Sequence, residues 1–386
     1  MPNHSLTNAQ KAKNDEFYTQ YSDIQKEVEA YLEYNPNTFL GKVVYCNCDD
    51  PFESNFFRYF VLNFKRLGLK QLITTSYKPS PIANTQIGLF GDDKTIVPDK
   101  GRPKITANKF VINEVGDTDG DGEFNLKDIA EQLKANKNNE WAPLEGDGDF
   151  RSSECVELLK QSDIVVTNPP FSLFREYVAQ LIKYGKRFVI IGNMNAITYK
   201  EIFPLIKDNK MWLGPSISSG DREFQVPDRY PLHAAGWRVD ENGKKYIRVK
   251  GVRWFTNLDH GRRHQPLALM TMADNLKFNK KMAGKTIYDI YDNHDAIEVP
   301  FTDAIPSDYD GVMGVPISFL DKYSPEQIEI LGITDRENIH GMRTKIYTVQ
   351  DSPKYGDLNR RAAIKVDDGY VATYARLLIR HRKVAK

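Results

Sequence analysis

The stretch that most constrains the fold is residues 163–171, with the sequence Asp-Ile-Val-Val-Thr-Asn-Pro-Pro-Phe. Its apolar run, residues 164–166, predicts a buried strand of a parallel sheet. The two prolines that follow cannot donate main-chain hydrogen bonds to a neighbouring strand, so the strand must end near Asn168. Ligands of open α/β sheets bind just beyond the carboxyl ends of the strands. We therefore expect Asn168 and Phe171 to lie at the mouth of a site.

The groups at this point suit a planar ligand that carries an exocyclic NH2, such as a nucleobase. Asn168 offers an amide oxygen and an NH2 group, and the main chain of Pro169 and Pro170 offers carbonyl oxygens at fixed angles. Phe171 offers an apolar face beside these acceptors. The same four residues also form an ordinary strand-to-loop break, because such dipeptides mark turns. On these residues alone both interpretations remain open.

The surrounding pattern predicts an α/β fold with a doubly wound, mostly parallel sheet. Residues 42–48 and 72–76 predict strands, and the phenylalanine-rich stripe between them predicts a helix with Pro51 near its start and Gly68 at its end. Such a strand–helix–strand unit implies a right-handed crossover. Ser22 with Gln25 fits a capping box for an earlier helix. Further strands are expected over residues 109–115, 187–191 and 211–213, and further helices over residues 129–135, 176–183 and 202–206.

The length of 386 residues allows two domains. We expect the first over residues 1–215, with residues 78–140 as an insertion rich in Pro, Gly, Asp and Asn. Residues 216–386 differ in character, since short strands there flank hairpin signals. Within this second part, residues 253–258 are suited to return to the sheet as a last strand.

Composition excludes several classes of protein. No apolar run approaches the roughly 20 residues of a membrane span, and the polar N-terminus lacks the apolar core of a signal peptide. Cys46, Cys48 and Cys155 are too few and too unevenly spaced for a disulfide framework or a four-ligand zinc site. We therefore expect a cytoplasmic protein with reduced thiols. The formal net charge of +1 means that a polyanion would meet a local basic surface.

Residues 117–128 match the calcium loop of an EF-hand. Asp117, Asp119 and Asp121 occupy positions 1, 3 and 5, Gly122 occupies position 6, and Asp128 occupies position 12. Position 12 is not the usual bidentate Glu, and the preceding residues predict a strand. The alternative is a solvated Asp-Gly turn that caps a helix. A bound Ca²⁺ would have a structural role.

Basic and aromatic residues alternate in the second half of the chain, a combination that suits a nucleic-acid surface. A solvated face with long side chains lying along apolar surface is the alternative. The arginines proposed to contact DNA are Arg253, Arg262, Arg263, Arg376, Arg380 and Arg382.

Asn168-Pro169-Pro170-Phe171 after a buried strand, with Asp149-Phe150 one strand earlier, makes the chain resemble amino-methyltransferases that use S-adenosylmethionine. More closely, it resembles the EcoRI family of adenine-specific DNA methyltransferases. The matching blocks are spread over nearly the whole chain. They comprise residues 15–20, 43–51, 146–154, 162–177, 197–201 and 311–316.

The resemblance implies a class I, Rossmann-like methyltransferase fold with a smaller mixed C-terminal region that recognises the target. It implies that Asp149 accepts a hydrogen bond from the adenine amine of the donor, with Phe150 packed nearby. Asn168, Pro169, Pro170 and Phe171 would form the catalytic motif. The other implied donor contacts are Phe17, Tyr18 and Thr19 of the N-terminal motif and Asn47, Asp49 and Asp50, which replace the usual Gly-rich loop.

The implied activity is transfer of a methyl group from S-adenosylmethionine to N6 of a flipped-out adenine in double-stranded DNA, within a restriction–modification system. A cognate restriction endonuclease would be a genetic, not a physical, partner. One alternative is N5-methylation of a protein glutamine, since the motif serves any amide NH2; the basic, aromatic half favours DNA. A second is a calcium-dependent binding module around residues 117–128.

Overall fold

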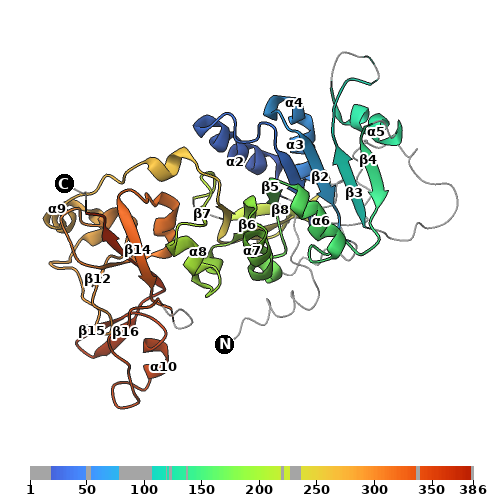
Figure 1. The fold of residues 1–386 in the computed structure, drawn as a ribbon. Coiled ribbons are helices and arrows are strands. Elements are labelled where there is room, and N and C mark those ends of the chain that lie inside the picture. The colour runs from blue at the N-terminus through green and yellow to red at the C-terminus, as the bar shows by residue number, and fades with distance from the viewer. Residues whose placement is uncertain are drawn as a thin grey trace. The chain divides into compact units, whose positions relative to one another are not determined.

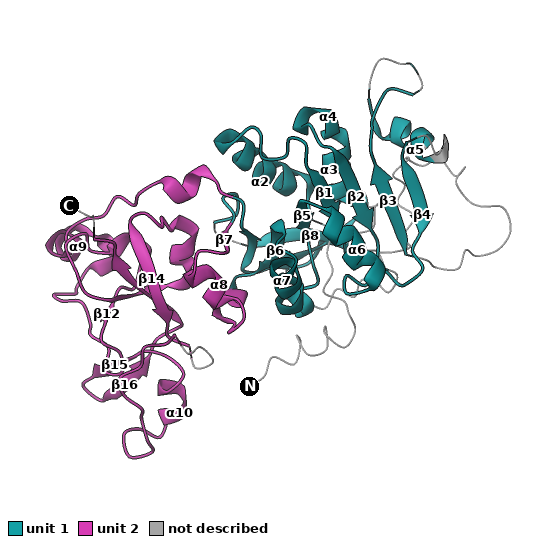
Figure 2. Cartoon of the chain, in the orientation of Figure 1, with its two compact units in different colours: residues 1–194, 214–258 teal, residues 195–213, 259–386 magenta. Residues whose placement is uncertain are grey.

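The computed structural model describes residues 19–48, 54–77, 107–118, 120, 124–135, 138–218, 221–226, 236–335 and 340–383. The chain divides into two compact units, each built from two segments (Figure 2). Unit 1 comprises residues 1–194 and 214–258, and unit 2 comprises residues 195–213 and 259–386. The expected division at residues 215 and 216 differs from this, because residues 214–258 fold with the first half of the chain.

Unit 1 contains most of one large sheet, whose strands lie in the order β4, β3, β2, β1, β5, β6, β11 (Figure 1). The four central strands, β2, β1, β5 and β6, are parallel to one another. β3, β4 and β11 are antiparallel to theirs. The sheet is therefore mixed with a parallel core, not mostly parallel as expected. Its strands are β1 (Val43–Cys46), β2 (Gln71–Thr75), β3 (Asn108–Ile112), β4 (Glu140–Pro143), β5 (Ile164–Thr167), β6 (Arg187–Asn193) and β11 (Val252–Thr256).

Two predictions about this sheet are confirmed. The apolar run of residues 164–166 forms the fully buried strand β5 at its centre. Residues 253–258 also return to the sheet, because β11 pairs with β6 from Val252 opposite Asn193 to Thr256 opposite Val189. Parallel neighbours must be joined by a crossover, usually a helix, whereas antiparallel neighbours can be joined by a short turn. The strands at the edges of this sheet are of the second kind.

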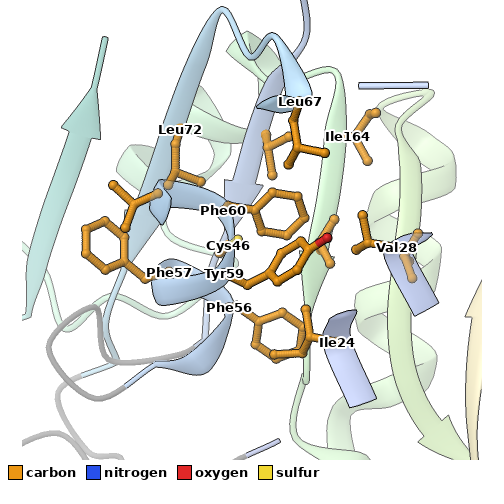
Figure 3. Packing of buried hydrophobic residues seen from close by; sticks show 14 of the residues in the cluster. Ile24, Val28, Cys46, Phe56, Phe57, Tyr59, Phe60, Leu67, Leu72 and Ile164 are labelled. Carbon is orange, nitrogen blue, oxygen red and sulfur yellow. The ribbon is translucent and has the colours of Figure 1, made fainter. Parts of the chain in front are cut away.

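Alternate residues of β1 face different helices. Val44 and Cys46 belong to a core cluster with α2 (Tyr21–Tyr34) and α3 (Asn55–Leu62), as Figure 3 shows in part. On the other face, the Tyr45 hydroxyl lies 2.9 Å from Oγ1 of Thr75. Burial raises the pKa of Tyr45, and the nearby Cys155 of α6 raises it further. The buried strands thus pack helices on both faces, as period-2 alternation in a strand requires.

The ends of these helices agree only in part with the caps and stops predicted from the sequence. The predicted phenylalanine stripe of α3 is buried, and Gly68 ends the following α4 (Phe64–Leu67) in the left-handed conformation. Ser54 caps α3, because its side chain accepts the N–H groups of Phe56 and Phe57. Pro51, predicted near the start of this helix, lies outside the described residues. The capping box predicted at Ser22 is wrong: α2 begins after Gln20 without a side-chain cap.

A separate three-stranded antiparallel sheet, in the order β8, β10, β9, completes unit 1. Phe224, Val226 and Ile247 point inward from it and join the core of the large sheet. Its strands are β8 (Arg222–Val226), β9 (Arg238–Val239) and β10 (Lys245–Val249).

Unit 2 is built on a four-stranded sheet in the order β12, β13, β17, β14. β17 (Arg376–His381) is an inner strand there, so the basic C-terminal segment is part of the fold. No helix in the described part of the chain is long and apolar enough to cross a membrane. The other strands of the chain are β7 (Trp212–Leu213), β12 (Ile297–Glu298), β13 (Met313–Pro316), β14 (Ile328–Ile333), β15 (Ala363–Val366) and β16 (Gly369–Ala372).

The remaining helices are mostly short. The α-helices are α5 (Leu126–Ala135), α6 (Ser153–Gln161), α7 (Phe174–Lys183), α8 (Phe203–Lys207), α9 (Met272–Phe278) and α10 (Tyr355–Leu358). The 3-10 helices are η2 (Phe171–Leu173), η3 (Met194–Thr198), η4 (Gly261–His264), η5 (Lys280–Met282), η6 (Thr302–Ala304) and η7 (Ile317–Lys322).

Candidate active site

Three neighbouring parallel strands, β2, β1 and β5, end at the same edge of the sheet. Asn168 follows the last residue of β5 and is 7% exposed, and Asn47 follows the last residue of β1 and is 3% exposed. Beyond β2 lies Ser76, against which the loop of Gly148 packs. The residues predicted from separate parts of the sequence therefore meet at the edge where α/β proteins bind ligands.

Asn47 connects the ends of β1 and β5. Its main-chain oxygen accepts a hydrogen bond from Oγ1 of Thr167, the residue before Asn168. Its side-chain Oδ1 accepts from the hydroxyl of Tyr177 in α7. Burial raises the pKa of the Tyr177 hydroxyl well above its usual value, which keeps it protonated as a donor. The two oxygens of Asn47 thus fix the end of β1 to the end of β5 and to helix α7.

Gly148 brings the loop of Asp149 onto the end of β2. It has φ of +78°, and a Cβ at this position would lie 1.9 Å from the carbonyl oxygen of Ser76. Only glycine tolerates both the left-handed backbone and this approach. Asp149 is consequently held next to the end of β2.

The Asp149 carboxylate is oriented by Arg151. Nε of Arg151 lies 2.9 Å from Oδ1 of Asp149, and Nη2 lies 2.7 Å from Oδ2. Nη1 of the same guanidinium lies 2.8 Å from Oε2 of Glu176 in α7. A planar bidentate pair of this kind fixes geometry as well as charge. Oδ1 of Asp149 also accepts the main-chain N–H of Arg151 at 2.9 Å.

Phe150 lies beneath this loop. It is 4% exposed, and its ring meets the ring of Tyr177 edge-on with 5.0 Å between centroids. Its carbonyl accepts a hydrogen bond of 2.9 Å from Nε2 of Gln180. Tyr177 therefore contacts both the Asp149 loop, through Phe150, and the end of β1, through Asn47.

The predicted catalytic motif turns from β5 into a helix. Asn168, Pro169 and Pro170 are buried, and the Pro170 carbonyl accepts the N–H of Leu173 in the short helix η2. Phe171 begins η2 and is only partly buried, with one side packed on the core cluster. Asn168 and the partly exposed Phe171 are therefore three residues apart where the chain leaves the edge of the sheet.

Thr19 lies at the start of α3, where Nδ2 of Asn55 donates a 2.7 Å hydrogen bond to its carbonyl. Its Oγ1 is buried and has no hydrogen-bond partner among the residues that the structure describes. A buried hydroxyl of this kind favours a ligand or water as partner. Phe17, Tyr18, Asp49 and Asp50, which were predicted to contact the donor, lie outside the described residues.

The chain matches, over residues 5–382, a family model described as the adenine-specific methyltransferase EcoRI. It is 45% identical over 333 residues to the type II methyltransferase M.EcoRI of Escherichia coli, a match covering 85% of this chain and 89% of that relative. The chain therefore belongs to the EcoRI family of adenine-specific DNA methyltransferases. The type II methyltransferase M.MpnI of Mycoplasma pneumoniae is 36% identical over 330 residues, covering 85% of each chain. No solved structure matches.

The protein is thus an adenine-specific DNA methyltransferase of the type II class that belongs to restriction–modification systems. The resemblance inferred from the sequence blocks is confirmed. The family decides against the two alternatives, a protein glutamine methyltransferase and a calcium-dependent binding module.

Two of the arginines predicted to contact DNA are buried in the fold. Arg253 is 4% exposed, and its guanidinium donates to the carbonyls of Val252 and Ser218. Arg263 is 6% exposed, lies 3.0 Å from Asp259, and its guanidinium carbon is 3.6 Å from the centroid of the Trp212 ring. These contacts favour structural roles for both, because burial of a guanidinium requires internal partners.

The C-terminal arginines also have internal partners. Arg376 lies 2.6 Å from Glu298, with only 12% and 6% of the two side chains exposed. Arg380 lies 2.6 Å from Glu329, and Nε of Arg382 donates to the carbonyl of Pro325. Arg262, in η4, is half-buried. These contacts give the C-terminal arginines roles in the fold, and their contact with DNA stays a prediction.

The predicted calcium loop has the geometry of a helix cap in its described part. Asp128 is fully buried, and its carboxylate accepts the N–H groups of Thr118 (2.7 Å) and Asn125 (2.8 Å). Asn125 in turn accepts the N–H of Lys127, which completes a reciprocal cap at the start of α5. Asp117 accepts the N–H of Gly120. Asp119 and Asp121 lie outside the described residues. Among the described residues, no cluster of side chains is suited to hold a metal ion. Calcium is not supported.

Proposed function

We propose that this methyltransferase binds S-adenosylmethionine beyond the carboxyl ends of β1 and β2 and the target adenine beyond β5. The observation that carries the proposal is the convergence of Asp149, Asn47 and Asn168 on three adjacent strand ends. The arrangement of parallel core strands with helices on both faces is consistent with a class I, Rossmann-like methyltransferase fold.

The residues present fit the donor. Asp149 would accept a hydrogen bond from its adenine amine, and Arg151 already holds the carboxylate in one orientation. The buried Oγ1 of Thr19 is a polar atom that a ligand could satisfy. Phe17, Tyr18, Asp49 and Asp50 would complete this half of the site. When bound, the donor supplies an electrophilic methyl group on a sulfonium.

The substrate half uses the motif after β5. The adenine must leave the duplex at an unstacking cost of a few kcal/mol, and stacking on Phe171 would offset about 1–3 kcal/mol of that cost. Oδ1 of Asn168 and the carbonyl of Pro169 would accept the two N6 hydrogens, which directs the nitrogen lone pair toward the methyl group. Positioning and electrostatics then promote an in-line displacement.

The substrate implied by the family is double-stranded DNA, and bases would be recognised mainly by the C-terminal part within residues 216–386. The recognition sequence expected from the family's namesake is GAATTC. Methylome sequencing of DNA from a host that expresses the protein identifies the bases that are recognised.

The variant Asn168→Ala tests the catalytic assignment. Loss of one preorganised electrostatic partner typically costs 10²–10³ in rate, about 2.7–4 kcal/mol. We expect that loss in single-turnover methyl transfer, with little change in the dissociation constants of S-adenosylhomocysteine or DNA. Asn37→Ala, at an exposed turn residue, is the matched control. A rate within about threefold of wild type would remove Asn168 from the catalytic role.

A further inference from the structure

The three-stranded sheet of unit 1 is attached at the edge that carries the candidate active site. Nδ2 of Asn193, the last residue of β6, donates a 3.0 Å hydrogen bond to the carbonyl of Lys250. The N–H of Met194 donates a 2.6 Å hydrogen bond to the carbonyl of Gly251. The turn between β10 and β11 therefore lies beyond the carboxyl end of β6.

This position is on the substrate side of the proposed site. β6 is the parallel neighbour of β5 on the side away from β1 and β2. Along the edge the order is thus Asp149 beyond β2, Asn47 beyond β1, Asn168 beyond β5 and Lys250 beyond β6. The donor half and the three-stranded sheet flank the catalytic motif from opposite sides.

The outer face of this sheet is polar, while its inner face is part of the core. Phe224, Val226 and Ile247 are 2–5% exposed and point inward. Alternation in a strand turns their neighbours outward. On the outer face Tyr246 pairs with Gln225 and Arg238, and Arg248 pairs with Glu223.

Two acidic groups of this sheet have internal partners. Glu223 forms an ion pair of 2.5 Å with Arg238, whose guanidinium lies 4.2 Å from the centroid of the Tyr246 ring. Asp240 accepts the N–H groups of Asn242 and Lys244 and the hydroxyl of Tyr246. Glu241 in the turn is a third acid, so Arg238, Lys244, Arg248 and Lys250 leave a small excess of positive charge.

Arg248, Lys250 and Lys244 are exposed. Within the described part of the chain, none of the three forms a salt bridge with a carboxylate. Gly236 lies against the side chain of Arg248, since a Cβ at Gly236 would be 3.3 Å from the Cβ of Arg248. The face therefore carries exposed cations that form no salt bridge with the described residues.

We propose that this outer face binds the sugar–phosphate backbone of the target DNA next to the flipped adenine. Arg248 and Lys250 would contact phosphates, as the arginines and lysines that position proteins on nucleic acid do. The surface extends the proposed function, since it rests on placing the catalytic motif at the end of β5.

The test is duplex binding by the double variant Arg248→Ala, Lys250→Ala over a series of salt concentrations. Each lost phosphate contact lowers the slope of log K against log salt by about 0.9, so the expected change is about 1.8. The matched control is the double variant Arg187→Ala, Lys70→Ala, which removes one exposed arginine and one exposed lysine at the opposite, amino-end edge of the sheet. It should keep the wild-type slope.

Calorimetry with S-adenosylhomocysteine should give wild-type affinity for both double variants, which shows that unit 1 is folded. The single variant Arg248→Lys should keep most of the wild-type slope, because a lysine also contacts phosphate. A slope equal to that of wild type in the Arg248, Lys250 double variant overturns the proposal. Asn168→Ala should keep the full slope, so this surface and the catalytic assignment can fail independently.

Discussion

Arg151 holds both carboxylate oxygens of Asp149, with its Nε 2.9 Å from Oδ1 and its Nη2 2.7 Å from Oδ2. The two residues are separated by Phe150 alone, whose ring packs on Tyr177. The carboxylate is therefore oriented before any ligand arrives. Such preorganisation lowers the entropy cost of binding.

We predict that Asp149→Ala weakens binding of S-adenosylhomocysteine by about 1–3 kcal/mol, because an acceptor that the ligand would bury is lost. Arg151→Ala should weaken it less, since the acceptor remains and only its orientation is lost. Isothermal titration calorimetry measures the affinity of both variants for S-adenosylhomocysteine. Glu176→Gln, at the outer end of the same network, should change this affinity least. Wild-type affinity in Asp149→Ala would take Asp149 out of the donor site.

Much of unit 1 could be predicted because its signals are local. The apolar run before Asn168 indicated a buried strand, and Gly68 ended a helix in the left-handed conformation that favours glycine. Carboxyl ends of parallel strands share one edge of a sheet, so the meeting of Asn47 and Asn168 follows from order along the chain.

The contacts that fix the site could not be predicted, because they join distant segments. Tyr177 donates to Asn47, which is 130 residues away, and nothing in the residues around either one indicates the pair. Gly148 is required by the carbonyl of Ser76, whereas its sequence context indicated only a turn. Tyr177 ends the block 162–177 that resembles the family, which was the one available signal.

The composition of residues 376–382 and their pattern indicate different things. The arginines suggested a DNA surface, whereas Leu377, Leu378 and Ile379 between them are at most 1% exposed. That apolar run is the signal of a buried strand. Likewise the spacing of residues 117–128 matched a calcium loop, while the carboxylate of Asp128 caps a helix.

The place of Arg376 gives a prediction that separates folding from DNA binding. Arg376→Ala leaves Glu298 buried without its cation, and breaking a buried pair of this kind costs about 3–5 kcal/mol. Urea unfolding should show that loss, and Arg382→Ala, at an exposed residue, should show little. If Arg376→Ala unfolds like wild type and only DNA affinity falls, Arg376 is a DNA contact. Truncation before Arg376 would remove the inner strand β17 and cannot answer this question.

The last prediction concerns pH and rests on His264, which lies between two carboxylates. Its Nε2 is 2.9 Å from Asp259, and its Nδ1 is 2.7 Å from Glu326. Hydrogen bonds to Asp259 and then to Glu326 raise the pKa of His264 above its ordinary value of 6.5. Arg263 also pairs with Asp259 and shares its charge.

Because the pKa of His264 is higher in the folded than in the unfolded protein, the protonated ring stabilises the fold. This contribution is complete below a pH of about 6.5 and is lost as the pH rises through the folded pKa. Burial has the opposite effect on His260 and His294, lowering the pKa of each to about 4. Their contributions are lost as the pH falls from about 6.5 toward 4, so measurements above pH 6.5 isolate His264.

We expect His264→Gln to be less stable than wild type near pH 6.5 and to approach it as the pH rises to about 9. Urea unfolding midpoints of the two proteins across this range give the comparison. His264 is partly exposed, with 34% of its side chain accessible, so salt should reduce the difference as it screens the ion pairs. A difference that stays constant from pH 6.5 to 9 would mean that packing or neutral hydrogen bonds, rather than the charge of His264, account for the effect.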